Sequence, residues 1–125
     1  MQIVISGSAP SKKNDRQIFV RNGRIVSIPS ARHKAWQDSA LAELASQYKG
    51  SVDGACIVIC QFYFENKRLK DLDNSLSSVL DVLVKSGLLP DDNYLVVPEV
   101  HAIFGGIDKE NPRTEVTIEE VDPVR

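Results

Sequence analysis

The sequence predicts an α/β domain of the α+β type, in which two main helices and a mixed β-sheet with a β-hairpin form two layers. Three observations predict this fold. Runs rich in β-branched and aromatic residues alternate with two amphipathic helical patterns, in the order strand, hairpin, helix, strand, helix, strand, strand. An Asn-Gly pair lies between two short apolar runs. The 125 residues suffice for one hydrophobic core, so we expect residues 1–125 to form a single domain.

The first half of the chain is expected to contain a strand, a hairpin and a helix. Residues 2–6 have a strand pattern, and residues 17–28 are predicted to form the hairpin, because both residues of its Asn-Gly turn accept a positive φ. Ser30 is a predicted helix N-cap. The helix is expected to run to about residue 49, with an apolar stripe formed by Trp36, Ala40, Leu41, Leu44, Ala45 and Tyr48.

The second half is expected to contain three strands and the second helix. Residues 55–64 are rich in β-branched and aromatic residues, which predicts a long central strand covered on both faces. A stripe of leucine and valine at helical spacing follows, and Gly87 is expected to end that helix. Residues 98–106 and 113–121 are predicted to be further strands.

Composition indicates an ordinary globular protein, with 42% apolar and 26% charged residues. No apolar run approaches the ~20 residues of a membrane helix, and the N-terminus lacks the regions of a signal peptide. We therefore expect a cytoplasmic protein with no membrane partner. Cys56 and Cys60 would lie about 13 Å apart along an extended strand. That distance is too long for a disulfide, so we expect two buried thiols and no zinc site.

Charge is unevenly distributed along the chain. Residues 1–34 contain seven Lys and Arg residues and one Asp, a net charge of +6, so the other 91 residues carry −8. A second basic cluster, Lys67, Arg68 and Lys70, precedes two aspartates. A basic patch on a mildly acidic protein suits a polyanion bound on one face, although a solvated surface would have the same composition.

The segment KDLDN, residues 70–74, carries two aspartates at the start of the second helical pattern. A calcium-binding EF-hand loop is excluded, because Leu76 and Val82 stand where that loop needs glycine and glutamate. Two interpretations stay open. In the first, one aspartate caps the helix.

In the second interpretation, the backbone stays extended to a helix start at or just after Asp73, so that both carboxylates project to one side and bind Mg²⁺. Asp91 or Asp92, in the turn after the helix, is then the candidate third carboxylate.

KDLDN, followed about twenty residues later by GLLPDDN, resembles the RusA family of Holliday junction resolvases of bacteria and their prophages. The family pattern also contains a Pro-Ser-x-x-Asn loop, matched here by Pro10, Ser11 and Asn14. The resemblance spans roughly residues 9–118.

The resemblance implies a homodimeric, Mg²⁺-dependent endonuclease, with Mn²⁺ as a substitute, that makes paired nicks in four-way junction DNA. It implies that Asp71, Asp73 and Asp92 bind the metal, that Asp91 is the neighbouring acid, and that Lys70 contacts DNA near the cut. The residues expected to bind DNA are Lys12, Lys13, Asn14, Arg16, Arg21, Arg24, Lys67, Arg68 and Lys70.

One position departs from the family pattern. Family members usually carry a lysine four residues after the second aspartate of DLDN, and here that position is Ser77. A non-cleaving module that binds branched DNA is therefore the alternative function, and a small interaction domain without a nucleic-acid role is the third. Neither His33 nor His101 lies in a recognisable motif.

Overall fold

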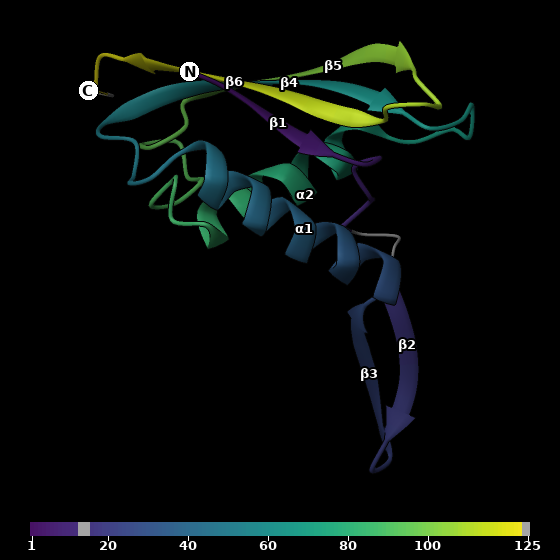
Figure 1. Cartoon of the computed structure of the whole chain (residues 1–125). Coiled ribbons are helices and arrows are strands. Elements are labelled where there is room, and N and C mark those ends of the chain that lie inside the picture. Colours follow the sequence, from purple (N-terminus) through teal and green to yellow (C-terminus); the bar gives the residue numbers. More distant parts are fainter. Residues whose placement is uncertain (13–15, 124–125) are drawn as a thin grey trace.

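The computed structural model describes residues 1–12 and 16–123. Its elements follow the predicted order: β1 (Gln2–Ser6), β2 (Arg16–Arg21), β3 (Arg24–Pro29), α1 (Ala31–Gln47), β4 (Ala55–Phe64), α2 (Leu72–Lys85), β5 (Glu99–Ile107) and β6 (Arg113–Val121). Figure 1 shows the two layers, with the main sheet on one side and both helices on the other. The predicted α+β fold is confirmed.

The main sheet is mixed, with the strand order β1-β6-β4-β5. β6 pairs antiparallel with both β1 and β4, whereas β4 and β5 are parallel. The parallel pair needs a crossover, which α2 provides. Consequently the end of β4 leads directly into the segment that carries KDLDN.

The helices cover only one face of this sheet (Figure 1). On β4, the side chains of one face are buried from Cys56 to Phe64, while those of the opposite face, such as Ile57 and Tyr63, are partly exposed. The prediction that this strand is covered on both faces is therefore wrong. A strand sequence that is mostly apolar does not distinguish a doubly buried strand from one whose second face is largely apolar but uncovered.

The predicted N-cap of α1 is confirmed, since the Ser30 hydroxyl accepts a hydrogen bond from the backbone N–H of His33 at 3.1 Å. Trp36, Ala40 and Leu44 pack into the core, as the apolar stripe predicts. The helix ends at Gln47, two residues before the predicted end. Within the described part of the chain, neither helix is long and apolar enough to cross a membrane.

The hairpin of β2 and β3 forms its own two-stranded sheet and projects from the body of the molecule (Figure 1). Asn22 and Gly23 have φ values of 53° and 74°, as the predicted turn requires. Several apolar side chains of the hairpin are exposed, among them Val20 and Ile25. The hairpin is thus held mainly by its own ladder and carries two arginines, Arg21 and Arg24, beside its turn.

Cys56 and Cys60 are free and buried, as predicted. Burial raises the pKa of Cys60 to about 12. The pKa of Cys56 is also raised, first by burial and then by the negative charge of Glu120. Both thiols therefore belong to the core and stay protonated at neutral pH.

Candidate metal site and nucleic-acid interface

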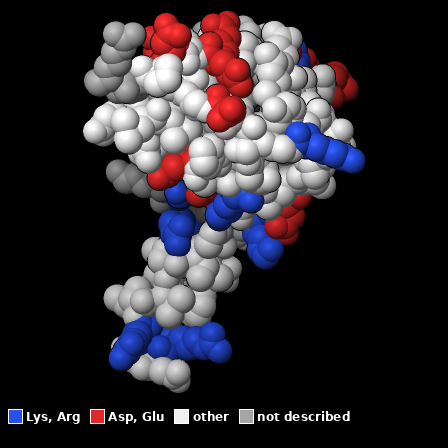
Figure 2. Space-filling model, turned by 90° about the vertical axis from the view of Figure 1, so that its left-hand side faces the viewer, with Lys and Arg blue, Asp and Glu red and all other residues white. Residues whose placement is uncertain are grey.

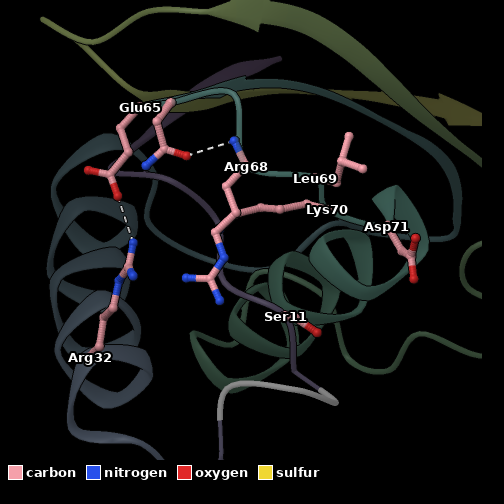
Figure 3. A pocket seen from close by; sticks show the side chains of 8 residues that line it. Ser11, Arg32, Glu65, Arg68, Leu69, Lys70 and Asp71 are labelled. Carbon is pink, nitrogen blue, oxygen red and sulfur yellow. Dashed lines mark hydrogen bonds and ion pairs between the residues drawn. The ribbon is translucent and has the colours of Figure 1, made fainter.

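The segment between β4 and α2 borders a polar pocket of about 180 Å³. Figure 3 shows this pocket between α1 and the beginning of α2. It is lined by Ser11, Arg32, Glu65, Asn66, Arg68, Leu69, Lys70 and Asp71. The first aspartate of KDLDN and two of the predicted DNA-binding residues thus share one pocket.

Three cations line this pocket: Arg32, Arg68 and Lys70. Glu65 forms an ion pair with Arg32 at 2.7 Å, so the pocket keeps more positive than negative charge even with Asp71 counted. Cationic side chains around a small polar pocket suit a phosphate group, which accepts charge-assisted hydrogen bonds. Arg32 is missing from the predicted DNA-binding residues. It lies far from Arg68 in the sequence, and only the position of α1 brings the two residues to the same pocket.

The loop that contributes Ser11 is attached to α2 by two buried serines. The Ser75 hydroxyl donates to the Ala9 carbonyl at 3.2 Å, and the Ser78 hydroxyl donates to the Pro10 carbonyl at 2.7 Å. Both serines are almost fully buried. Sequence reasoning missed them, since serine in a helix gives no signal of a tertiary partner. They fix the Pro-Ser loop against the helix that starts at the aspartates.

Both aspartates of KDLDN are exposed at the N-terminal end of α2. The helix begins at Leu72, one residue before the predicted start, so Asp71 is the extended N-cap residue and Asp73 already lies in the first turn. The Asp71 carboxylate makes no capping hydrogen bond. The Asp73 carboxylate accepts a hydrogen bond from the backbone N–H of the next residue, Asn74, at 2.9 Å. Carboxylate oxygens of both residues therefore remain available at a helix end that favours negative charge.

Asp91 and Asp92 lie at the other end of α2. The helix has 14 residues, which corresponds to a rise of about 21 Å. Backbone hydrogen bonds from Val52 to Leu88 and from Cys56 to Val96 place the intervening loop beside the start of β4, whereas KDLDN follows the end of that strand. Among the described residues, no group of three or more His, Cys, Asp and Glu side chains could hold a metal ion. One chain does not bring Asp92 to Asp71 and Asp73.

The turn itself is well ordered by local bonds. The Asp91 carboxylate accepts from the backbone N–H of Asp92 at 2.7 Å and from the Asn93 amide at 2.9 Å. No hydrogen bond or ion pair from the described residues reaches the Asp92 carboxylate. The Asp91 carboxylate therefore stabilises the turn, whereas the Asp92 carboxylate is exposed to solvent.

The remaining predicted DNA-binding residues are distributed over the loop and the hairpin. Lys67 is exposed beside Arg68, and Arg21 pairs across the hairpin with Arg24. Arg16 is held within the hairpin, where it donates two 2.7 Å hydrogen bonds to Ser27. Figure 2 shows Lys and Arg gathered near the hairpin tip and where the hairpin meets the body. Lys13 and Asn14 lie outside the described residues.

Lys12 has an acidic partner in the structure, Asp81 on α2, at 3.4 Å. Partial burial would raise the pKa of Asp81, but hydrogen bonds and charges from Lys85 and Lys12 outweigh burial and lower it. The ion pair with Asp81 thus partly neutralises the positive charge of Lys12.

Residues 9–119 match the family described as endodeoxyribonuclease RusA. A crossover junction endodeoxyribonuclease RusA of Aquifex aeolicus (strain VF5) is 33% identical over 95 residues, which cover 75% of this chain and 72% of that protein. The residues matched to the family include the Pro-Ser loop, KDLDN and the Asp91-Asp92 turn. The chain therefore belongs to the endodeoxyribonuclease RusA family of nucleases.

Proposed function

We propose that the protein is a Mg²⁺-dependent endonuclease that resolves four-way DNA junctions by paired, symmetric nicks. The observation that carries this proposal is the cationic pocket, because Arg32, Arg68 and Lys70 surround a space that Asp71 also borders. A phosphodiester bound by these cations would lie next to the candidate metal ligands. The family and the crossover junction relative support the same substrate.

Asp71 and Asp73 would hold the metal ion, which fits their chemistry and their surroundings. Mg²⁺ typically takes one or two carboxylates and keeps positions for water and phosphate oxygens. Oxygens of both carboxylates remain available. When bound, the metal would supply Lewis-acid activation of water and neutralise charge at the reacting phosphate.

The protein's own cations would position the substrate. Arg32, Arg68 and Lys70 would bind oxygens of the phosphate and orient the phosphodiester toward Asp71 and Asp73. Lys67 and the hairpin arginines, Arg21 and Arg24, would contact phosphates of the arms. The expected products are 5′-phosphate and 3′-hydroxyl ends, and binding should weaken steeply with salt.

A homodimer would complete the site. Since one chain keeps Asp92 at the far end of α2, its carboxylate would reach Asp71 and Asp73 of a second copy instead of its own. A two-fold dimer would then have two equivalent composite sites, and two equivalent sites would nick two symmetry-related strands of a junction. We expect this dimer to act in the bacterial cytoplasm.

The test is cleavage of a synthetic four-way junction with and without Mg²⁺. We expect wild-type protein to nick two opposed strands only with Mg²⁺, and Asp73→Asn to bind the junction without nicking it. Removing one metal-binding carboxylate should lower the rate by about 10²-fold or more. If wild-type protein and Asp73→Asn both bind the junction but neither nicks it, the result would favour the non-cleaving binding module.

A further inference from the structure

A second pocket, of about 300 Å³, lies on the other side of the segment 67–70. Its walls are apolar and come from Phe64, Leu72, Phe104 and Ile107. Lys67, Arg68 and Lys70 also border it, and the last two border the polar pocket as well. The segment 67–70 is therefore a ridge between a phosphate-sized cationic pocket and an apolar one.

The apolar pocket exists because the helical layer does not cover the end of the sheet. Phe62 and Phe64, on the covered face of β4, are buried, but the side chains of Phe104 and Ile107 on β5 are 55% and 42% exposed. The pairing of β4 with β5 shifts register between Phe62 and Tyr63, opposite Gly105. A Cβ on Gly105 would lie 2.7 Å from the Tyr63 ring, so glycine lets Tyr63 pack over this irregularity.

The pocket presents aromatic surface beside positive charge. The rings of Phe64 and Phe104 stack at a centroid distance of 6.3 Å with an angle of 17° between their planes. The Lys70 ammonium lies 5.3 Å from the centroid of the Phe64 ring. A ligand with a flat apolar ring and an attached anion would match both features, and a nucleotide has that combination.

Leu69 stands on the crest of the ridge. Its side chain borders both pockets and is 97% exposed, more than any other large apolar side chain among the described residues. Figure 3 shows it directed away from Arg32 and the rest of the cationic group. Full exposure of a leucine side chain between Arg68 and Lys70 is unfavourable in water, but such a side chain suits insertion between DNA bases.

We propose that Leu69 is a wedge that unstacks a base next to the cleaved phosphate, and that the Phe64–Phe104 pocket receives the displaced base. The proposal rests on the proposed function, since it needs junction DNA as the substrate. The phosphate on one side of the base would occupy the cationic pocket, and Lys67 and Lys70 would neutralise the backbone at the rim. A junction suits this step, because bases at its branch point are the least costly to unstack.

The test uses four-way junctions that carry 2-aminopurine at single positions beside the branch point, with the full-length protein and EDTA to prevent cleavage. We expect wild-type protein to increase the 2-aminopurine fluorescence at one position, which reports an unstacked base. Leu69→Ala should abolish most of this increase, and Phe104→Ala should also weaken junction affinity roughly tenfold, as for the loss of a base–aromatic stack.

Val121→Ala is the matched control, since Val121 is a partly exposed apolar residue that pairs with Ala55 at the opposite end of β4. It should leave fluorescence and affinity unchanged. Leu69 is exposed, so Leu69→Ala should fold normally and keep the test valid even where Phe104→Ala does not fold.

Two results would overturn the proposal. In the first, wild-type protein binds and nicks junctions but does not increase the 2-aminopurine fluorescence, or Leu69→Ala increases it as much as wild type does. The other is a loss of the dimer in Leu69→Ala and Phe104→Ala, measured by light scattering, which would assign the pocket to a second copy of the chain. Failure of the proposed function is distinct from both, because wild-type protein would then neither prefer nor cut junctions.

Discussion

Ser77 shows how a single residue separates this chain from the family pattern. Its hydroxyl donates to the Asp73 carbonyl at 3.0 Å, so it turns back onto its own helix. The usual lysine of the family would extend from this position, one turn above Asp73, toward a bound phosphate. The serine therefore supplies no positive charge to the site.

We predict that Ser77→Lys raises the rate of junction cleavage by about tenfold, because an added ammonium would stabilise charge on the reacting phosphate. Single-turnover cleavage measures the rate. Ser77→Ala is the control and should cleave at the wild-type rate. A Ser77→Lys rate at or below wild type would show that the ammonium of Lys70 or of the partner already fills this role.

Cys60 gives a prediction about alkaline stability. Its pKa in the folded protein is raised to about 12 from the ordinary 9.0. The unfolded thiol thus loses its proton first, so the stability contribution is complete below pH 9 and is lost as the pH rises toward 12. The slope should be about 1.4 kcal/mol per pH unit.

Urea unfolding of wild type and Cys60→Ala at several pH values between 8 and 11 isolates this contribution, because the other titrating groups are common to both proteins. We expect the free energy of unfolding to fall more steeply with pH in wild type. Parallel pH profiles would contradict the buried position of the thiol.

Single residues also show the limits of sequence reasoning about the site. Lys70, Asp71 and Asp73 can be recognised in the sequence because they lie within one five-residue motif, KDLDN. Arg32 cannot, since its role depends on α1 packing beside the end of β4. A motif reveals residues that are close in sequence, whereas a pocket gathers residues from several elements.

At the scale of elements, α2 connects the whole site. Its first turn carries Asp73, its buried serines hold the loop of Ala9 and Pro10, and its far end leads to Asp92. The sequence predicts the helix well, because its apolar stripe is regular, and misplaces its start by one residue. It does not predict which face of β4 stays uncovered, since that depends on where both helices pack.

We predict that Ser78→Ala destabilises the protein by about 1–3 kcal/mol, because the mutation leaves the Pro10 carbonyl without its buried hydrogen bond. Urea unfolding measures the loss. Junction affinity should fall as well, since the loop that contributes Ser11 to the cationic pocket is released. Ser77→Ala, on the exposed side of the same helix, should change stability by less than about 0.5 kcal/mol. Equal effects of both mutations would show that the loop is held by other contacts.

At the scale of the whole molecule, the proposed metal site would need a second chain, because one chain keeps Asp92 at the far end of α2 from Asp71 and Asp73. The sequence suggests three acids close in space, because Asp91 and Asp92 follow the same helix. In the structure, Asp91 and Asp92 lie the length of α2 away from Asp71 and Asp73. A local sequence pattern cannot reveal this separation, because it depends on the topology of the fold. Composite sites in a dimer would bring the acids together again.

This arrangement predicts that two inactive variants complement each other. Homodimers of Asp73→Asn and of Asp92→Asn should both be inactive, whereas a mixed dimer would retain one site with all its carboxylates. Random exchange of subunits should restore about a quarter of the wild-type sites, each producing an unpaired nick. Tagged subunits verify the exchange. An exchanged mixture without activity would contradict composite sites.

The most direct test of the central claim is cleavage of a supercoiled plasmid that extrudes a cruciform. Paired nicks across the four-way junction convert this plasmid to linear DNA, whereas single nicks produce open circles. We expect linear product in the presence of Mg²⁺, none with EDTA, and none with Asp73→Asn. Open circles alone, or Mg²⁺-independent product equal in wild type and Asp73→Asn, would contradict this expectation.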